Sequence, residues 1–259
     1  MPDCAQQSWS PGHVELSFSS AAQVHSNLGH YNPALPSGLR VTGVLATTVS
    51  TGAMRTIDVL VTNITQYEPW NHRVTSLHQS FLYVNLATPH PGENLERRQT
   101  EFLMAFLDPL DDSPVTFESV QLTFLDFDQI DGSGNGMECA SFPPTINASG
   151  VPDAVLLGLN TLLPESGGVS VASDPHNQGW QRACSRWAGV GPDNPDDPMA
   201  MTEAQRAKAA SVVYAGASSV QFRLSINAVG WGGRNFIISG QSNMIPQCAS
   251  SPSPSPSIS

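Results

Sequence analysis

The residues best suited to chemistry lie in one acidic segment, which reads F-L-D-F-D-Q-I-D-G-S-G-N-G-M-E over positions 124–138. Its oxygen-bearing side chains are Asp126, Asp128, Asp131, Asn135 and Glu138. Oxygen donors gathered this closely suit a hard cation such as Ca²⁺, which takes its ligands from carboxylates and amide carbonyls. The segment therefore predicts a Ca²⁺ site at these residues.

An alternative interpretation of the acidic segment needs no metal. The ligand spacing departs from an EF-hand loop by an extra residue and the flanks are strand-like, so an EF-hand is excluded. The aspartates and glycines could instead build a polar hairpin, in which Asp126 and Asp128 hydrogen-bond to the turn. Under either interpretation no cofactor is required, and Ca²⁺ is the one ion that the pattern suggests.

Catalytic signatures are missing from the sequence. The seven histidines form no H-E-x-x-H motif, and there is no nucleophile elbow, phosphate-binding loop or dinucleotide fingerprint. Asp126 and Asp128 could act as a glycosidase pair. Their positions on one face of one strand are more typical of a metal site or a turn, so we predict that the protein is not an enzyme.

The elements that position these residues are predicted to be strands. Charged residues make up only 13% of the 259-residue chain, and glycine and proline number 21 each, which favours short strands joined by turns. Strand-like patterns occur in segments 13–18, 56–63, 117–127, 220–226 and 235–239, where apolar residues recur among polar ones with a period near two, and in 81–86 and 102–107, which are apolar and aromatic. Strands at this spacing predict a mostly β fold, a jelly-roll-like β-sandwich.

A short helical insertion is predicted within this sandwich. Thr202-Glu203-Ala204-Gln205 forms a capping box, which begins a helix near 202–214 that ends before Gly216. A second short helix is predicted over 154–163. Together they place a loop and helix insertion at about 140–215, inside a single domain that covers residues 1–249.

The cysteines favour an oxidising compartment. No C-x-x-C pair occurs, which disfavours a cysteine-based zinc site, and the even number fits two disulfides. Three pairings are possible; we favour Cys4–Cys248, which joins the termini, and Cys139–Cys184, which closes a long loop. Four buried free thiols are the alternative.

Several segments predict covalent glycans. Asn63-Ile-Thr65 and Asn147-Ala-Ser149 are N-glycosylation acceptors. Residues 250–259 read S-S-P-S-P-S-P-S-I-S, which favours an extended polyproline II tail. Its prolines Pro252, Pro254 and Pro256 are predicted sites of hydroxylation and O-glycosylation. A plain flexible linker is the alternative for this tail.

The charge distribution excludes some partners. The formal net charge is −11 and Lys208 is the only lysine, so nucleic acid and anionic membranes are disfavoured. No apolar run approaches the ~20 residues of a membrane span. The first residues do not read as a signal peptide, so an extracellular or cell-surface location would make this a mature chain or a fragment.

Three segments together resemble an uncharacterised secreted β domain of algae and other protists. They are 59–71 (V-L-V-T-N-I-T-Q-Y-E-P-W-N), 122–138 with its F-x-D-F-D core, and 193–205 followed by G-G-R-N-F at 232–236. The resemblance spans most of residues 40–240, implies an extracellular β domain, and carries over no catalytic residue. The Ser-Pro tail is similar to the hydroxyproline-rich modules of algal and plant extracellular glycoproteins.

These observations predict an extracellular structural glycoprotein, a subunit of a fibre, cell wall, flagellar hair or matrix. Its partners would be copies of itself in a homopolymer, or other extracellular glycoproteins. An edge strand near the N-terminus, within 6–18, is the predicted contact between copies. The alternative is a carbohydrate- or ligand-binding module assisted by Ca²⁺, because Trp180, Trp187 and Trp231 lie in polar, loop-like surroundings where aromatic rings can stack on sugars.

Overall fold

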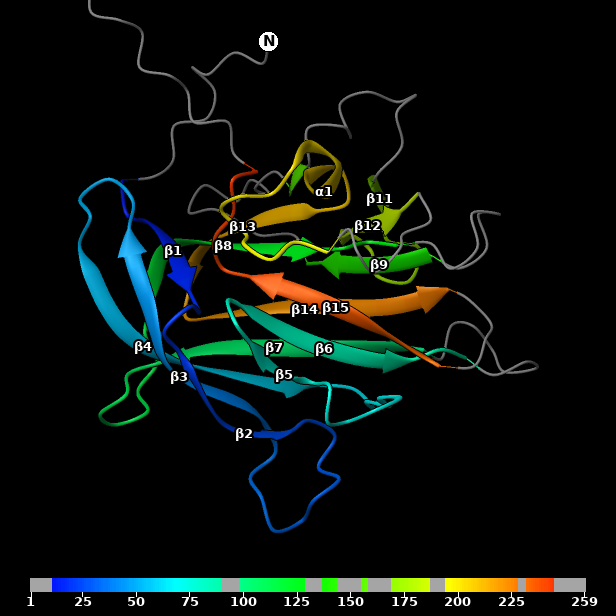
Figure 1. Ribbon diagram of the computed structural model, residues 1–259, viewed down its shortest axis with the longest axis horizontal. Coiled ribbons are helices and arrows are strands. Elements are labelled where there is room, and N and C mark those ends of the chain that lie inside the picture. Colours follow the sequence, from blue (N-terminus) through cyan, green and yellow to red (C-terminus); the bar gives the residue numbers. More distant parts are fainter. Residues whose placement is uncertain are drawn as a thin grey trace, which may run out of the picture.

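The structure is a computed structural model that describes residues 11–89, 98–128, 137–143, 155–157, 169–186, 194–227 and 232–244 (Figure 1). In these residues strands dominate, with one short helix, α1 (Glu203–Ala207), and no helix long and apolar enough to cross a membrane. The strands are β1 (His13–Ser17), β2 (Ala22–Asn27), β3 (Gly38–Thr48), β4 (Met54–Asn63), β5 (Ser76–His78), β6 (Phe81–Ala87), β7 (Gln99–Leu107), β8 (Phe117–Leu125), β9 (Met137–Phe142), β10 (Val155–Leu157), β11 (Val169–Ser173), β12 (Gln181–Ser185), β13 (Ala210–Ala217), β14 (Ser219–Asn227) and β15 (Gly233–Ser239). The prediction of a mostly β fold is confirmed.

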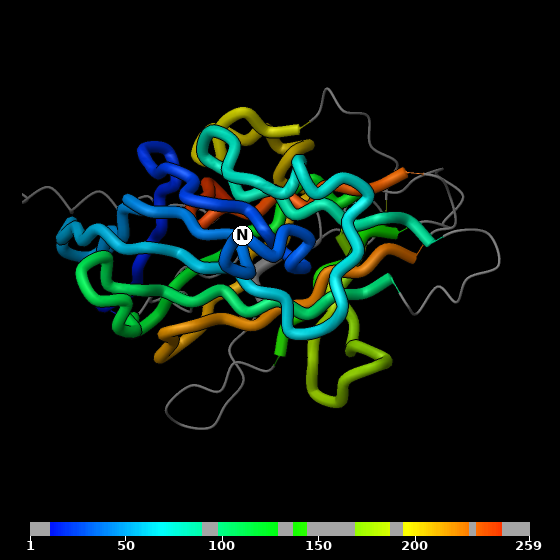
Figure 2. The backbone as a smooth tube through the Cα atoms, turned by 90° about the horizontal axis from the view of Figure 1, so that it is seen from below, coloured from blue at the N-terminus to red at the C-terminus, as the bar shows by residue number. Residues whose placement is uncertain are grey.

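The strands form one curled 15-stranded sheet whose two halves face each other in a β-sandwich-like arrangement. One half has the order β11-β12-β9-β14-β7-β4-β3, with β2 beside β3. The other contains β8-β15-β6-β5, with β13 and β10 beyond β8. β1 joins the halves, because it pairs antiparallel with β3 and parallel with β8. Figure 2 shows β4, β7 and β14 side by side in the first half.

The aromatic core holds the two halves together. Alternation along β7 buries Phe102, Met104 and Phe106, while the residues between them are only partly buried. Phe124 of β8 lies 5.2 Å from Phe222 of β14, measured between ring centroids, so side chains from both halves meet in the core. Full burial of one such side chain contributes about 1.5–3 kcal/mol to folding.

A second, smaller core covers the outer face of β8 and β15. Met201, Ala209 and Met244 pack there with Leu125 and Ile237. These contacts hold the segment around α1 against the sheet. They place the residue after α1, Lys208, close to the end of β8, where the Lys208 carbonyl accepts a hydrogen bond of 2.9 Å from the backbone amide of Phe127.

Every segment predicted to be a strand lies wholly or largely within one, namely β1, β4, β6, β7, β8, β14 and β15. The sequence pattern does not indicate β3, because a bulge interrupts the alternation of its residues. Its register against β4 shifts between Val41 and Val44, and Gly43 between them has a φ of 75°. That left-handed conformation suits glycine, which has no Cβ.

The helix predicted near 202–214 begins as expected but its predicted end is wrong. The capping box is present: Thr202 Oγ1 accepts from the Gln205 amide, and Gln205 Oε1 accepts from the Thr202 amide. α1 nevertheless ends at Ala207, and β13 follows from Ala210. Pairing along β8 and burial of Val212 and Tyr214 outweigh the helix propensity of the alanines.

Much of the region 140–215, expected to be a loop and helix insertion, supplies strands to the sheet. β12 pairs with both β9 and β11, and β11 is the outermost strand of its half. The second predicted helix is wrong at 155–157, where β10 pairs with β13. The tail at 250–259 lies outside the described residues.

The predicted edge strand near the N-terminus is not an edge. β1 lies between β3 and β8, and Leu16 also bridges to Gly240. Its backbone is therefore paired on both sides over much of its length. A strand in this position cannot accept a strand from a second copy without first leaving its own sheet.

Candidate functional site

The acidic segment lies where the chain passes from β8 in one half of the sheet to β9 in the other. Asp126 and Asp128 follow β8, and Glu138 lies on β9. Lys208 Nζ is 3.0 Å from Asp128 Oδ1. Arg234 on β15 forms an ion pair with Glu138, and its Nη2 is 3.8 Å from Asp128 Oδ2. The carboxylates of Asp128 and Glu138 thus face two cations of the protein itself.

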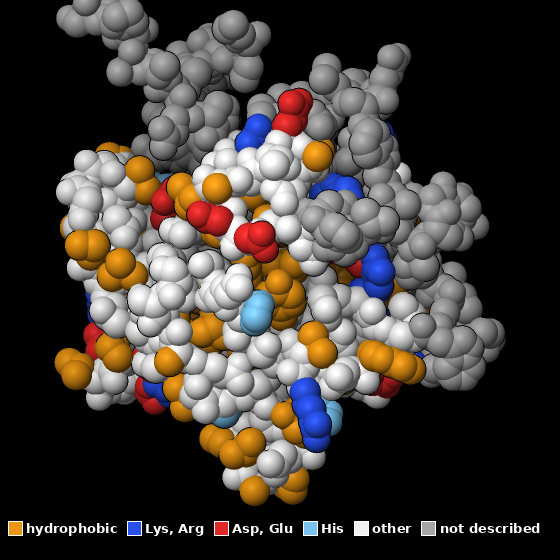
Figure 3. Space-filling view, viewed as in Figure 1, with side chains coloured by type: hydrophobic (Ala, Val, Ile, Leu, Met, Phe, Trp, Pro, Cys, Tyr) orange, Lys and Arg blue, Asp and Glu red, His pale blue; other side chains and the backbone are white. Residues whose placement is uncertain are grey.

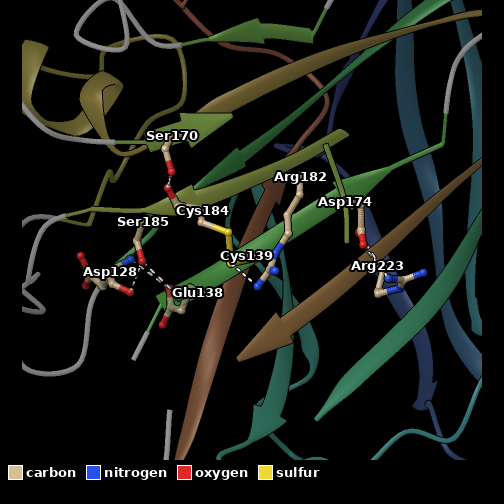
Figure 4. Close-up of a disulfide and its surroundings, with 9 residues drawn as sticks. All are labelled: Asp128, Glu138, Cys139, Ser170, Asp174, Arg182, Cys184, Ser185 and Arg223. Carbon is tan, nitrogen blue, oxygen red and sulfur yellow. Dashed lines mark hydrogen bonds and ion pairs between the residues drawn. A yellow bond between two sulfur atoms is a disulfide. The ribbon is translucent and has the colours of Figure 1, made fainter. Parts of the chain in front are cut away.

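Hydrogen bonds fix the backbone of this ion-pair cluster (Figure 4). The Asp128 amide donates to Glu138 Oε2 at 3.1 Å, and the Glu138 amide donates to Ser185 Oγ at 3.1 Å. Ser185 Oγ in turn donates to the Asp128 carbonyl at 2.8 Å. Asp126 has a φ of 61°, a left-handed conformation that aspartate tolerates better than most residues. The cluster therefore connects β8, β9, β12 and β15.

The described residues fit the metal-free interpretation of the acidic segment. Two of the predicted ligands, Asp131 and Asn135, lie outside them. Within the part of the chain that the structure describes, no group of three or more histidine, cysteine, aspartate or glutamate side chains could hold a metal ion. The Ca²⁺ site stays a prediction, and Asp128 and Glu138 already lie beside Lys208 and Arg234.

The Glu138 carboxyl should make stability depend on pH. Burial raises its pKa to about 7 from an ordinary value of 4.5, against the opposing effect of Arg234. The folded state therefore binds the proton more tightly than the unfolded chain does. The stabilisation of the folded state by this proton is complete below pH 4.5 and is lost as the pH rises through about 7. The free energy of unfolding should fall by about 3 kcal/mol over this range. Urea unfolding from about pH 5 to pH 8 should show this loss in the wild type and not in Glu138→Gln.

Glu203→Gln is the matched control for this pH dependence. It removes one carboxylate from the exposed first turn of α1, so it changes the net charge by the same amount. A difference in unfolding free energy between wild type and Glu138→Gln that stays constant over the whole pH range would contradict the prediction.

The predicted disulfide between Cys139 and Cys184 is confirmed. The two residues face each other on the paired strands β9 and β12, with 4.1 Å between their Cα atoms. Both are buried, and Arg182 Nη2 donates to the Cys139 sulfur at 3.1 Å (Figure 4). The other predicted pair, Cys4 and Cys248, lies outside the described residues.

A second buried charge network lies on the outer face of the same sheet half. Arg223 on β14 is 3% exposed. Its Nη2 lies 2.9 Å from Glu101 Oε1 on β7, and its Nη1 lies 3.2 Å from Asp174 Oδ2 after β11. The Trp180 ring lies 5.0 Å from the guanidinium carbon, a cation–π distance. Burial alone would raise the pKa of Asp174, but hydrogen bonds from Ser141 and nearby amides, together with Arg223, lower it below its ordinary value.

A cavity of about 540 Å³ adjoins this network. It lies where β6 ends and β7 begins, next to the loop that follows β4. Arg223 and Glu101 contribute to its wall, and so do Arg98 and Glu68, which form an ion pair with each other. The cavity thus combines charged side chains with a volume in the usual range for ligand pockets.

Comparisons with known proteins assign no role to these features. No family model matches the chain, and no curated protein matches it. The role of the cavity and of the charge networks must therefore come from the chemistry of their own side chains.

The Arg223 network and the cavity were not predicted from the sequence. One signal was present: Glu101 and Arg223 are charged residues directly before or after core phenylalanines, Phe102 and Phe222, in strands that are otherwise largely uncharged. Their direct pairing across β7 and β14 appears only once the strand register is known.

Asn63, a predicted glycan acceptor, ends β4 and is half-buried. Its Nδ2 donates to the Thr65 carbonyl at 2.9 Å, and its Oδ1 accepts from the Gly29 amide at 3.0 Å. A sugar on Nδ2 would replace one of two hydrogens, so the other could still donate to Thr65. The second acceptor, Asn147, and the proline sites Pro252, Pro254 and Pro256 lie outside the described residues.

Only one of the three tryptophans proposed for sugar stacking is described. Trp180 is half-buried and stacks on Arg223 rather than standing free in a loop. Trp187 and Trp231 lie outside the described residues. A different tryptophan, Trp70, is 53% exposed in the loop between β4 and β5.

Proposed function

We propose that this chain is an extracellular structural glycoprotein, which associates with copies of itself or with other extracellular glycoproteins in a fibre, wall, flagellar hair or matrix. The Cys139–Cys184 disulfide is compatible with an oxidising compartment. The two sequons and the Ser-Pro tail support a surface that carries glycans. The resemblance to secreted algal domains supports the same setting.

The observation that carries the proposal is the edge of the sheet at β11. This strand, V-S-V-A-S, is the last of its half and pairs only with β12 among the described strands. It has no charged residue, no proline and no bulge. Natural proteins usually protect an edge with one of these features, so an edge without them can pair with another chain.

The other edges differ from β11. β2 carries a bulge between Gln23 and His25, and β5 and β10 have three residues each. Side chains also connect β2 to β5: Gln23 Oε1 accepts from the Leu77 amide at 2.9 Å, and Ser26 Oγ donates to the Thr75 carbonyl. Among the described strands, β11 is therefore the edge best suited to strand addition.

The surface chemistry supports contacts between copies. Orange and white atoms prevail over charged side chains in the described part of the face in Figure 3, and the acidic side chains are spread over its upper part and its lower edges. The net charge of −11 still opposes association over a distance. Salt screens this repulsion, so assembly should increase with ionic strength.

A lysine on the β11 edge should prevent association of the native protein. Ala172 is exposed on β11, and Ala172→Lys would place like charges side by side if strands from two copies paired there. We expect the wild type to form oligomers or fibres in high salt and Ala172→Lys to remain monomeric. Analytical ultracentrifugation and negative-stain imaging would measure the difference.

Ala53→Lys provides the matched control, because Ala53 is equally exposed but lies in the β3–β4 turn. This variant should assemble like the wild type. The proposal fails if the wild type stays monomeric at every salt concentration, and the role of β11 fails if Ala172→Lys assembles normally.

A further inference from the structure

We infer that the cavity beside Glu101 and Arg223 is a binding site for a neutral saccharide. The volume of about 540 Å³ can hold a small ligand, and most of its described lining residues come from β6, β7 and β14 or from the loop after β4. The Ile64 amide donates to the Glu101 carbonyl at 2.7 Å, and the Ala87 amide donates to the Glu68 carbonyl at 2.9 Å. The loop after β4 is thereby bonded to both β6 and β7.

The charges on the wall cancel. Among the residues that the structure describes, the charged lining residues are two arginines, Arg98 and Arg223, and two glutamates, Glu68 and Glu101. Each arginine is bonded to one of these glutamates, and Arg223 also contacts the carboxylate of Asp174. A bound anion would have to compete with these carboxylates for the arginines, and a bound cation with the arginines for the carboxylates. The wall therefore favours a ligand without net charge.

Paired charges still offer both kinds of hydrogen-bonding group. A carboxylate has about four acceptor sites and a guanidinium has five N–H donors, more than one ion pair uses. Thr65, Gln66, Gln99 and Thr100 add hydroxyl and amide groups to the wall. Sugar hydroxyls donate and accept at once, so they match a wall that carries both donors and acceptors.

The described lining also includes apolar side chains. Leu86 and Ala87, at the end of β6, contribute to the lining. A pyranose ring presents C–H groups on its faces, and such apolar side chains suit them. A lining with both charged and apolar side chains favours a sugar over a fully apolar ligand, which would desolvate the charged groups without offering them a polar partner.

The polar wall is held in place before any ligand arrives. Glu101 accepts from Arg223 Nε at 3.3 Å and Nη2 at 2.9 Å, and from Gln221 Nε2 at 3.2 Å. Trp180 covers the guanidinium of Arg223 at 5.0 Å. Side chains fixed in this way lose little conformational entropy on binding, which favours affinity.

This site is independent of the proposed assembly at β11. Its ligand could come from two sources with the same chemistry, a polysaccharide of the surroundings or a glycan on another copy of this chain. The two are separated by comparing protein made with glycans and protein made without them.

The test is calorimetric titration of the glycan-free protein with neutral disaccharides, using cellobiose, mannobiose, xylobiose, galactobiose and chitobiose as probes. At least one should bind, and Gln99→Trp, which fills the cavity, should weaken binding at least about tenfold. Gln181→Trp is the matched control, because Gln181 is exposed on β12 outside the cavity lining, and it should bind like the wild type. Thermal unfolding of each variant verifies that it is folded.

Glu68→Gln gives a second variant that should remain folded, because the Glu68 side chain is 48% exposed. It unbalances the wall charge and should also weaken binding at least about tenfold. The inference is overturned if none of the disaccharides binds, if only digalacturonate or chitosan dimers bind, or if Gln99→Trp binds as the wild type does. If glycosylated protein self-associates and the free disaccharide disperses it, the natural ligand is a glycan on a neighbouring copy. If only added polysaccharide is bound, the natural ligand is a polysaccharide of the surroundings.

Discussion

Replacing Arg223 with methionine is expected to lower the free energy of unfolding by about 3–5 kcal/mol. The side chain of Asp174 is 1% exposed and that of Glu101 is 21% exposed, and both would lose the cation that contacts them. A buried carboxylate that has lost its cation is far more costly than the absence of the whole pair. Urea unfolding at neutral pH, followed by tryptophan fluorescence and circular dichroism, would measure the loss.

Arg55→Met is the control for this prediction. Arg55 pairs with Asp108 at 2.7 Å, but its side chain is 51% exposed, so the loss should stay within about 1 kcal/mol. Combining Arg223→Met with Asp174→Asn should recover part of the stability, because the unpaired charge is removed together with its partner. Equal losses for Arg223→Met and Arg55→Met would show that the buried network does not stabilise the fold.

Removal of the disulfide by Cys139→Ala and Cys184→Ala together is expected to cost about 4 kcal/mol. The two cysteines are 45 positions apart, so the bond closes a long loop and restricts the unfolded chain. The alanines also remove buried sulfur atoms from the neighbouring strands β9 and β12.

The slope of urea unfolding separates the two effects of the disulfide. If the bond acts mainly on the unfolded chain, the double variant should expose more surface on unfolding and show a larger m-value. Ser141→Ala, a buried change on the same strand, should leave the m-value unchanged. A double variant that loses less than about 1 kcal/mol would contradict the prediction.

The strands that could be predicted are those with one face in a strongly apolar core. β14 alternates apolar with polar residues and β7 contains a run of phenylalanine, leucine and methionine, and both patterns are visible in the sequence alone. β9 and β12, M-E-C-A-S-F and Q-R-A-C-S, consist largely of small or polar residues and show no such alternation. Their place in the sheet depends on pairing with neighbours, which a local pattern does not contain.

The acidic segment shows that a local sequence pattern also misses the long-range partners of a site. Its carboxylates could be identified from the sequence, but the cations that lie beside Asp128 and Glu138 could not. Lys208 lies 80 positions after Asp128, and Arg234 lies 96 positions after Glu138. Carboxylates without a visible counterion suggest a metal, whereas the lysine and the arginine beside Asp128 and Glu138 become visible only in the fold. The Cys139–Cys184 pair could be predicted because few pairings were possible.

The burial of Lys208 limits the covalent chemistry of the protein. Lys208 is the only lysine of the chain and is 7% exposed beside Asp128. Acylating reagents, aldehyde fixatives, ubiquitin ligases and amine oxidases all need a reachable side-chain amine, and the folded protein keeps its one such group buried in an ion pair. Covalent maturation of any assembly must therefore use other functional groups. For the same reason, modification of this single amine would report the opening of the sandwich itself.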